Sequence, residues 1–162
     1  MGSGKTTIGG LLAARLQRSF VDVDDRIEAA AGRRIAEIFD LRGEAAFRDL
    51  ESRELDALLA RAKEPLVIAL GGGAFAEAGN RERIARSGAL TVFLECPLDV
   101  LRERCAQAAH RPLARDPDAF ARLLEARAPA YRQASVTVAT GSGTPEEAVE
   151  QIALAALAAG VL

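Results

Sequence analysis

The sequence is poor in the residues that build metal and redox sites. It contains one histidine, two cysteines, one methionine and no tryptophan among 162 residues. Cys96 and Cys105 do not have a CxxC spacing, and a single histidine adds little to a metal-binding set. We therefore expect two buried or neutral thiols rather than a zinc site.

Long apolar runs are also missing. The longest uncharged apolar stretches, at 66–70 and 152–162, are far shorter than the ~18 residues that a transmembrane helix needs. The N-terminus enters a glycine-rich segment without the basic, apolar and cleavage regions of a secretory signal. These absences predict a protein with no transmembrane helix and no signal peptide, located in the cytoplasm.

Neither sign of charge is in clear excess. The chain has 21 lysines and arginines against 23 aspartates and glutamates, which gives a net charge of −2 at pH 7. This balance argues against a nucleic acid or an anionic membrane as a partner, so any anion site must be local. Only Lys5 and Lys63 are lysines, and Lys5 lies in the glycine-rich segment.

The order of the expected elements predicts the fold class. A chain of this length is expected to form one domain over residues 1–162. Apolar and β-branched runs predict strands at 19–23, 66–70, 90–94 and 136–139. Apolar periodicity predicts helices at 8–16, 24–31, 34–41, 44–61, 80–86, 98–108, 118–128 and 145–159. This alternation is typical of an α/β domain with a three-layer arrangement, a parallel sheet flanked by helices, in which ligands bind at the carboxyl ends of the strands. Residues 109–117 have no periodic apolar face, and we expect a lid at about 106–117.

The glycine-rich segment has the pattern of a phosphate-binding loop. Its residues Gly2, Ser3, Gly4, Lys5, Thr6 and Thr7 carry the GK[ST] end of the P-loop pattern GxxxxGK[ST] and run directly into a helix. In such a loop the backbone N–H groups and the helix N-terminus surround the nucleotide phosphates. Lys5 then reaches the β- and γ-phosphates, and the Thr6 hydroxyl can bind Mg²⁺. The segment therefore predicts a nucleotide site.

The start of the P-loop pattern lies outside the sequence. The first glycine of the pattern, and the strand that feeds the loop, would precede Met1. We accordingly expect a P-loop fold that lacks its first, central strand, in a reading frame shortened by roughly ten residues. A strand missing from the middle of a sheet leaves unpaired backbone groups on both of its neighbours.

Acidic residues and glycines follow the first two predicted strands. Asp22, Asp24 and Asp25 come at the end of the first strand, and Gly71, Gly72 and Gly73 at the end of the second. We expect Asp25 to be the N-cap of the following helix. Asp22 and Asp24 could also be turn or cap residues, but their position at a strand end favours a site. Three glycines at such an end suit the close approach of a ligand.

Taken in order, these motifs resemble those of the shikimate kinase family, P-loop kinases of the nucleoside-monophosphate-kinase type. After the P-loop the matching segments are Asp22-Val23-Asp24, Gly32-Arg33, Gly43-Glu44, Phe47-Arg48 with Glu51, Leu70-Gly71-Gly72-Gly73, Arg111-Pro112-Leu113, and Arg127 with Tyr131-Arg132. The resemblance covers essentially the whole chain. It implies transfer of the γ-phosphoryl group of ATP to the 3-hydroxyl of shikimate, with ATP and Mg²⁺ as cofactors, in a protein that needs no partner chain.

The resemblance also implies residue roles. Asp22 is similar to a Mg²⁺ carboxylate that acts with Thr6, and Asp24 to the carboxylate that binds the substrate hydroxyls and takes the attacking proton. Arg48 and Arg127 resemble the pair that binds the substrate carboxylate, together with Gly71, Gly72 and Gly73. Arg111 resembles the lid arginine that closes over the γ-phosphate and Arg104 the arginine against the adenine, while Glu51, one turn after Arg48, is expected to hold that arginine in place. The family often has a basic residue where this chain has Gly143, so the adenine contacts are the weakest part of the match.

Three alternatives remain open from the sequence. The chain could be gluconate kinase or another small-molecule P-loop kinase of similar size. It could be a kinase-like domain that senses a ligand without catalysis, although it keeps the charged residues that the reaction needs. It could also be inactive as it stands, because the central strand is missing.

Overall fold

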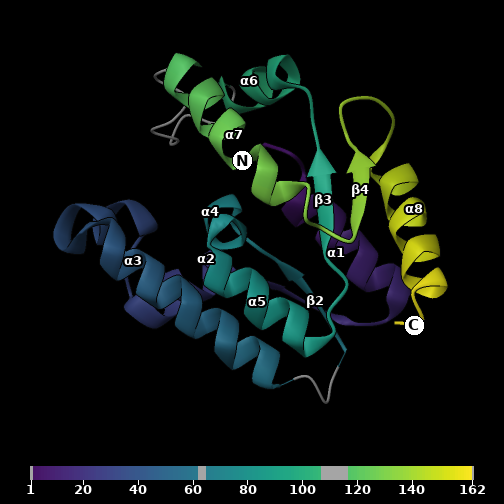
Figure 1. The fold of residues 1–162 in the computed structure, drawn as a ribbon, viewed down its shortest axis with the longest axis horizontal. Helices are drawn as coiled ribbons and strands as arrows, with labels where there is room; N and C mark the ends of the chain where they lie inside the picture. The colour runs from purple at the N-terminus through teal and green to yellow at the C-terminus, as the bar shows by residue number, and fades with distance from the viewer. Residues whose placement is uncertain (1, 62–64, 107–116, 162) are drawn as a thin grey trace. The chain divides into compact units, whose positions relative to one another are not determined.

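The computed structural model describes residues 2–61, 65–106 and 117–161. It divides into two compact units, which are described one at a time. The middle unit is Ala13–Ala89, and the terminal unit combines Met1–Leu12 with Leu90–Leu162. Helix α1 (Lys5–Leu16) belongs to both, since it begins in the terminal unit and ends in the middle unit (Figure 1).

The middle unit is built on a pair of parallel strands. Strand β1 (Ser19–Asp22) pairs with β2 (Leu66–Ala69), with Ser19 opposite Leu66 and Asp22 opposite Ala69. This register brings the carboxyl ends of both strands to one edge, so the acidic residues after β1 and the glycines after β2 leave the sheet side by side. The remaining elements of this unit are α2 (Val23–Ala31), α3 (Ile35–Ala60), α4 (Gly72–Ala76) and α5 (Ala78–Ser87).

Helix α2 begins one residue after β1 because Asp22 caps it. The Asp22 carboxylate accepts a hydrogen bond from the Asp24 backbone N–H at 3.1 Å. The prediction that Asp25 is the N-cap is therefore wrong: the strand leads straight into the helix, and Asp25 already lies in its first turn. The predicted start of this helix was one residue late for the same reason.

Helix α3 is long but broken at Gly43. The φ and ψ angles of Gly43, 75° and 173°, are not helical, and they divide the helix between the two segments expected at 34–41 and 44–61. An ion pair between Arg26 and Glu54, 2.7 Å long, joins α2 to the second segment. Beneath these helices lies the apolar core of the unit, formed by Val23, Ile27, Ile38, Phe47 and Leu58 with partly buried neighbours from both strands. The core fixes α3, and with it Arg48, against the strand ends.

The three glycines after β2 are not a plain loop. Gly71 is the N-cap of α4, a five-residue helix that begins at Gly72 and that the sequence analysis missed. Helix α5 follows directly, with a start two residues earlier than predicted. Short helices of this kind have no apolar periodicity to detect, because five residues make little more than one turn.

The terminal unit has a second pair of parallel strands. Strand β3 (Val92–Glu95) pairs with β4 (Val136–Ala139), with Val92 opposite Val136 and Glu95 opposite Ala139. Its helices are α6 (Leu98–Ala106), α7 (Pro117–Tyr131) and α8 (Pro145–Ala158). Cys96 is buried in a small cluster with Leu101 and Phe120, which confirms one of the two buried thiols. The Cys105 side chain and the core of the predicted lid at 107–116 lie outside the described residues.

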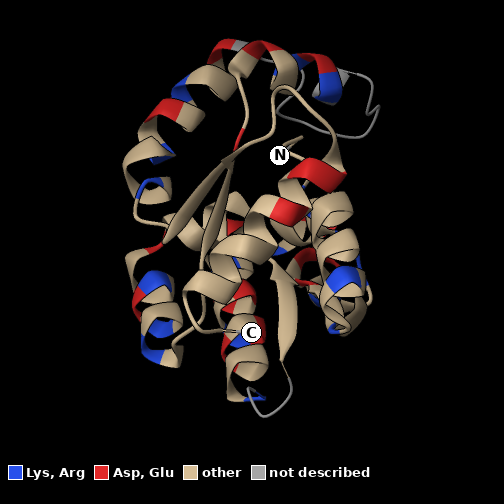
Figure 2. Ribbon diagram, turned by 90° about the vertical axis from the view of Figure 1, so that its right-hand side faces the viewer, with Lys and Arg blue, Asp and Glu red and all other residues tan. Residues whose placement is uncertain are grey.

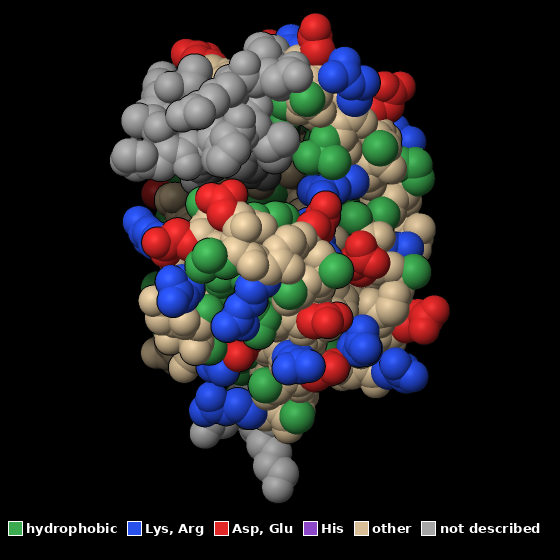
Figure 3. All heavy atoms as spheres, turned by 90° about the vertical axis from the view of Figure 1, so that its left-hand side faces the viewer, with side chains coloured by type: hydrophobic (Ala, Val, Ile, Leu, Met, Phe, Trp, Pro, Cys, Tyr) green, Lys and Arg blue, Asp and Glu red, His purple; other side chains and the backbone are tan. Residues whose placement is uncertain are grey.

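The residues described form two-stranded parallel sheets and many helices, the α/β class expected from the sequence. Within the described ranges, no helix is long and apolar enough to cross a membrane. Basic and acidic residues are both distributed over the ribbon in Figure 2, and on the face drawn in Figure 3 basic and acidic side chains are mixed.

Candidate active site

The P-loop of the terminal unit leads into helix α1. Gly2 and Gly4 have φ angles of 75° and 88°, values that glycine adopts without strain. The Gly4 carbonyl accepts the first α-helical hydrogen bond, from the Ile8 N–H at 2.8 Å, so that Lys5 is the first residue of the helix. The backbone N–H groups of a first helical turn point out of the helix toward its N-terminus, where the helix dipole adds positive potential. The segment has the geometry of an anion site, as its sequence predicted.

A cavity of about 240 Å³ adjoins the P-loop. It is lined by Gly2, Ser3, Gly4 and Thr7 of the P-loop region, by Arg104 of α6, and by the segment from Thr140 to the start of α8. All of these residues belong to the terminal unit. The cavity thus continues from the predicted phosphate loop toward the segment in which the sequence analysis expected the adenine contacts.

Arg104 connects the two sides of this cavity. Its Nη1 donates to the Gly2 carbonyl at 3.4 Å, and its Nη2 donates to the Thr140 carbonyl at 3.2 Å. A weaker contact of 3.8 Å joins Nη1 to the Cys96 sulfur. The guanidinium therefore lies at the cavity wall with its planar group bonded to backbone on both sides.

Gly143 has a structural reason to be a glycine. Its φ angle is 87°, and a Cβ atom there would collide with the Glu147 carboxylate. That carboxylate accepts the Thr144 N–H at 3.0 Å, while the Thr144 hydroxyl accepts the Glu147 N–H at 3.2 Å. Any other residue at position 143 would need a strained backbone conformation and a shift of the capping Glu147 side chain.

A separate cluster of predicted site residues lies in the middle unit, where its two strands end. A Cβ atom built on Gly71 would lie 3.2 Å from Asp24 Oδ1 and 3.1 Å from Glu51 Oε1. A Cβ on Gly73 would lie 2.6 Å from the Cζ of Arg48, so the guanidinium is stacked directly on this glycine. Two carboxylates and one guanidinium thus converge on the glycine segment, and the two glycines leave the space that they occupy.

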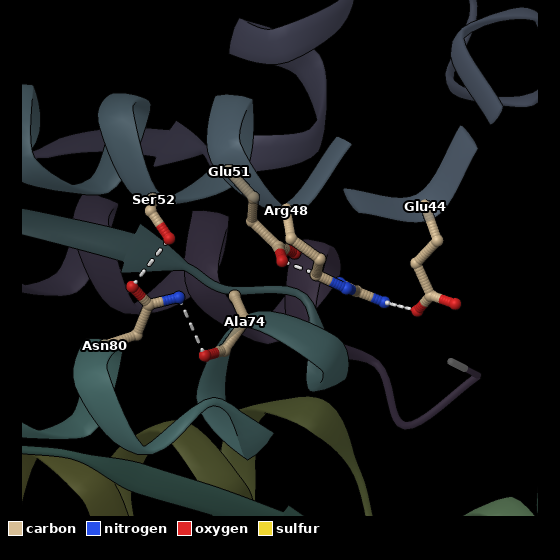
Figure 4. Close-up of polar contacts among 6 residues, drawn as sticks. All are labelled: Glu44, Arg48, Glu51, Ser52, Ala74 and Asn80. Carbon is tan, nitrogen blue, oxygen red and sulfur yellow. Dashed lines mark hydrogen bonds and ion pairs between the residues drawn. The ribbon is translucent and has the colours of Figure 1, made fainter. Parts of the chain in front are cut away.

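Arg48 is held between two glutamates (Figure 4). Its Nη1 donates to Glu51 at 2.6 Å, and its Nη2 donates to Glu44 at 3.1 Å. The Glu51 side chain is 2% exposed and the Glu44 side chain 67%, so Glu51 is the buried anchor. Burial acts to lower the pKa of Arg48, but the hydrogen bonds and charges of Glu51 and Glu44 outweigh it and raise the pKa. Arg48 therefore stays cationic; its side chain is 20% exposed, and its guanidinium lies against Gly73.

Sequence reasoning missed Asn80. Its side chain is buried, and it is bonded to Ser52 of α3 and to the Ala74 carbonyl of α4. One signal was available in the sequence, because Asn80 shares a face with the buried Ile84 one turn later, where an apolar residue is expected. A polar residue at such a position requires a partner.

The remaining predicted site residues lie on other elements or outside the described residues. Asp22 is buried at the cap of α2, Arg127 is half-buried on α7 of the terminal unit, and Arg111 lies outside the described residues. Among the described residues no three histidine, cysteine or acidic side chains gather as a metal site. The donors expected for Mg²⁺, the Thr6 hydroxyl and the Asp22 carboxylate, are hard oxygen ligands of the type that Mg²⁺ combines with phosphates and water.

Comparison with known proteins identifies the family. The shikimate kinase family model matches residues 1–157. The chain belongs to the shikimate kinase family. The shikimate kinase of Cereibacter sphaeroides is 47% identical over 150 residues, which cover 91% of this chain and 74% of that protein. The shikimate kinase of Psychrobacter arcticus is 43% identical over 156 residues, 94% of this chain and 82% of that protein.

Solved structures of shikimate kinases have the same fold. The enzyme from Acinetobacter baumannii, determined in complex with shikimate, matches with a TM-score of 0.89 and 36% identity, covering 98% of this chain and 89% of that one. The enzyme from Aquifex aeolicus matches with a TM-score of 0.85 and 37% identity over 100% of this chain and 94% of that one. The predicted family and the P-loop α/β fold class are therefore confirmed. Members of this family are ATP-dependent phosphotransferases, and shikimate kinase is the activity of this chain.

Proposed function

We propose that this shikimate kinase transfers the γ-phosphoryl group of ATP to the 3-hydroxyl of shikimate with the residues that converge at the P-loop and at the glycine segment. The observation that carries the proposal is the cluster in the middle unit, where the Arg48 guanidinium is stacked on Gly73 and the Asp24 carboxylate lies beside Gly71. A cation and a carboxylate at one strand edge match the two ends of a hydroxylated carboxylic acid. The guanidinium fork suits a planar carboxylate, and Asp24 suits the hydroxyl groups.

The nucleotide is proposed to occupy the cavity of the terminal unit. Its phosphates would lie at the N–H groups of the P-loop, with Lys5 at the β- and γ-phosphates. Its base would lie against Arg104 and beside the segment 142–145. In this assignment Arg104 keeps its backbone bonds and offers the face of its guanidinium to the adenine.

Phosphoryl transfer needs an aligned hydroxyl and stabilised charge more than covalent chemistry by the protein. The shikimate hydroxyl oxygen forms a bond to the γ-phosphorus, the bond from that phosphorus to the β-γ bridging oxygen breaks, and ADP leaves. The hydroxyl proton passes to Asp24. Lys5 offsets the charge that develops on the phosphates, and Mg²⁺, when bound through Thr6 and Asp22, would supply further positive charge there.

Several features of the sequence analysis stay predictions within this proposal. Arg127 is proposed to join Arg48 at the substrate carboxylate, and Arg111 to arrive over the γ-phosphate with the lid at about 106–117. Closure of such a lid would keep water from competing with shikimate as acceptor. A single catalytic domain, a monomeric state and a cytoplasmic location are likewise proposed, with no nucleic-acid or membrane partner.

A coupled ADP-release assay tests the proposal. The chain is incubated with ATP, Mg²⁺ and either shikimate or gluconate. We expect ADP release in the presence of shikimate and none in the presence of gluconate. Asp24→Asn should lower kcat by at least about a hundredfold, the lower end of what general-base catalysis contributes, while ATP binding is retained. Asp25→Asn is the matched control, because Asp25 lies in the same helical turn and is exposed. An Asp24→Asn variant with full activity would refute the role of Asp24. ADP release with gluconate but not with shikimate would refute shikimate as the substrate.

A further inference from the structure

Asn80 is a fully buried polar residue that the reaction itself does not use. It is 1% exposed, and its amide makes three hydrogen bonds (Figure 4 shows two of them). Its Nδ2 donates to the Ala74 carbonyl at 3.1 Å. Its Oδ1 accepts from the Ser52 hydroxyl at 3.0 Å and from Arg83 Nη1 at 3.1 Å.

These partners fix the orientation of the amide. A guanidinium can only donate and a backbone carbonyl can only accept, so the Asn80 oxygen must face Arg83 and its nitrogen must face Ala74. Aspartate at this position would still accept from Ser52 and Arg83, but it would lose the N–H donor to the Ala74 carbonyl. Asparagine is therefore a residue that can satisfy all three partners at once.

Two of these bonds, to Ser52 and to Ala74, join the two elements that hold the proposed shikimate ligands, while the bond from Arg83 lies within α5. Ser52 follows Glu51 on α3, one turn after Arg48. Ala74 follows Gly73, on which the Arg48 guanidinium is stacked. Asn80 thus connects the helix that carries the arginine to the segment that the arginine contacts, from the side opposite to the guanidinium.

Helix α4 needs such a connection because it is short. A helix of five residues does not persist in water by its own hydrogen bonds. Its last carbonyls are bonded by side chains of α5: Asn80 binds that of Ala74, and Arg81 binds those of Phe75 and Ala76, at 2.9 and 2.6 Å. The position of the preceding glycines therefore depends on α5.

We propose that Asn80 is a positioning residue for shikimate binding, which sets the distance between the Arg48 guanidinium and the Gly71–Gly73 segment. The inference rests on the proposed function, since it takes Arg48 and the glycines as shikimate ligands. Asn80 itself touches neither substrate. Loss of its bond to Ala74 releases the glycine segment and weakens shikimate binding, while the nucleotide cavity, which is lined by residues of the terminal unit, keeps its affinity for ATP.

The experiment compares Asn80→Asp with two other variants of the intact chain. Asn80→Asp removes the bond to α4 and keeps acceptors for Ser52 and Arg83. Ser52→Ala removes one bond on the α3 side and leaves the amide in place. Ile84→Ala is the matched control, because Ile84 is buried on the same helix one turn later and its side chain is apolar. Melting temperature, kcat, and the KM values for shikimate and for ATP are measured for each.

Asn80→Asp is expected to raise the KM for shikimate about tenfold and to change the KM for ATP less than about twofold, as the loss of one buried hydrogen bond suggests. Ile84→Ala is expected to lower the melting temperature with no such split between the KM values. An unchanged KM for shikimate in Asn80→Asp, or the same split in Ile84→Ala, would overturn the proposal. If Asn80→Asp does not fold, Ser52→Ala decides the question: a rise of about threefold in the KM for shikimate alone supports the proposal, and no rise overturns it. Failure of the wild-type chain to phosphorylate shikimate would instead refute the proposed function.

Discussion

Replacing Glu51 with glutamine tests how the buried anchor of Arg48 contributes to stability and binding. Glutamine has nearly the same shape and keeps one acceptor oxygen, so the substitution removes the negative charge and little else. The hydrogen bond that it weakens joins Arg48 Nη1 to a carboxylate at 2.6 Å, in a place where the Glu51 side chain is 2% exposed.

The size of the expected loss in stability follows from the burial of Glu51. Hydrogen bonds to charged groups contribute about 1.5–3 kcal/mol, and the 20% exposure of Arg48 reduces the loss when its buried partner is neutralised. We expect Glu51→Gln to lower the free energy of unfolding by about 2 kcal/mol. For a chain of this size that corresponds to a melting temperature about 4–8 °C lower. The KM for shikimate should rise as well, because Arg48 is no longer held over Gly73.

Glu44→Gln is the matched control. It removes the other partner of the same guanidinium, but the Glu44 side chain is 67% exposed and the pair spans i and i+4 on a helix. Such pairs contribute about 0.3–0.5 kcal/mol, so the melting temperature should fall by less than about 2 °C. Thermal unfolding and steady-state kinetics measure both effects. Equal shifts for the two variants, or no shift for Glu51→Gln, would refute the view that burial makes Glu51 the anchor.

Three further predictions concern other parts of the site and fold. Gly73→Ala places a Cβ against the Arg48 guanidinium and should raise the KM for shikimate without changing that for ATP; equal KM values in wild type and variant would contradict the stacking. Arg104→Ala should do the reverse, raising the KM for ATP alone, because it opens the wall of the nucleotide cavity. The backbone N–H of Ile35, which donates to Glu28 at 2.9 Å, lowers the pKa of that carboxyl below its ordinary value of 4.5. The ionised Glu28 carboxylate therefore stabilises the fold above pH 4.5, and this stabilisation is lost as the pH falls through its lower folded-state pKa. The free energies of unfolding of wild type and Glu28→Gln, measured in urea across this range, should become equal at low pH.

Local patterns in the sequence determined the chemistry of this protein. A glycine-rich segment with Lys5, followed by a helix, predicts phosphate binding, because the backbone geometry of the loop depends only on neighbouring residues. The acidic residues after β1 and the glycines after β2 could be placed at one edge from strand order alone, since parallel strands end together. The break at Gly43 was also foreseeable, because no regular helical pattern continues across it.

The tertiary structure decided which side chains share an environment. Glu44 lies four residues before Arg48 and Glu51 three residues after it, so both can reach the guanidinium, and only packing buries Glu51 and exposes Glu44. The position of Asn80 on an apolar face indicates that it needs a partner, but its partners could not be identified from the sequence, because Ser52 and Ala74 lie 28 and 6 residues away and meet it only after α3, α4 and α5 have packed together. Sequence patterns thus predict which groups bind and react, whereas the three-dimensional packing determines which groups hold them in place, because burial and partner geometry depend on contacts between residues distant along the chain.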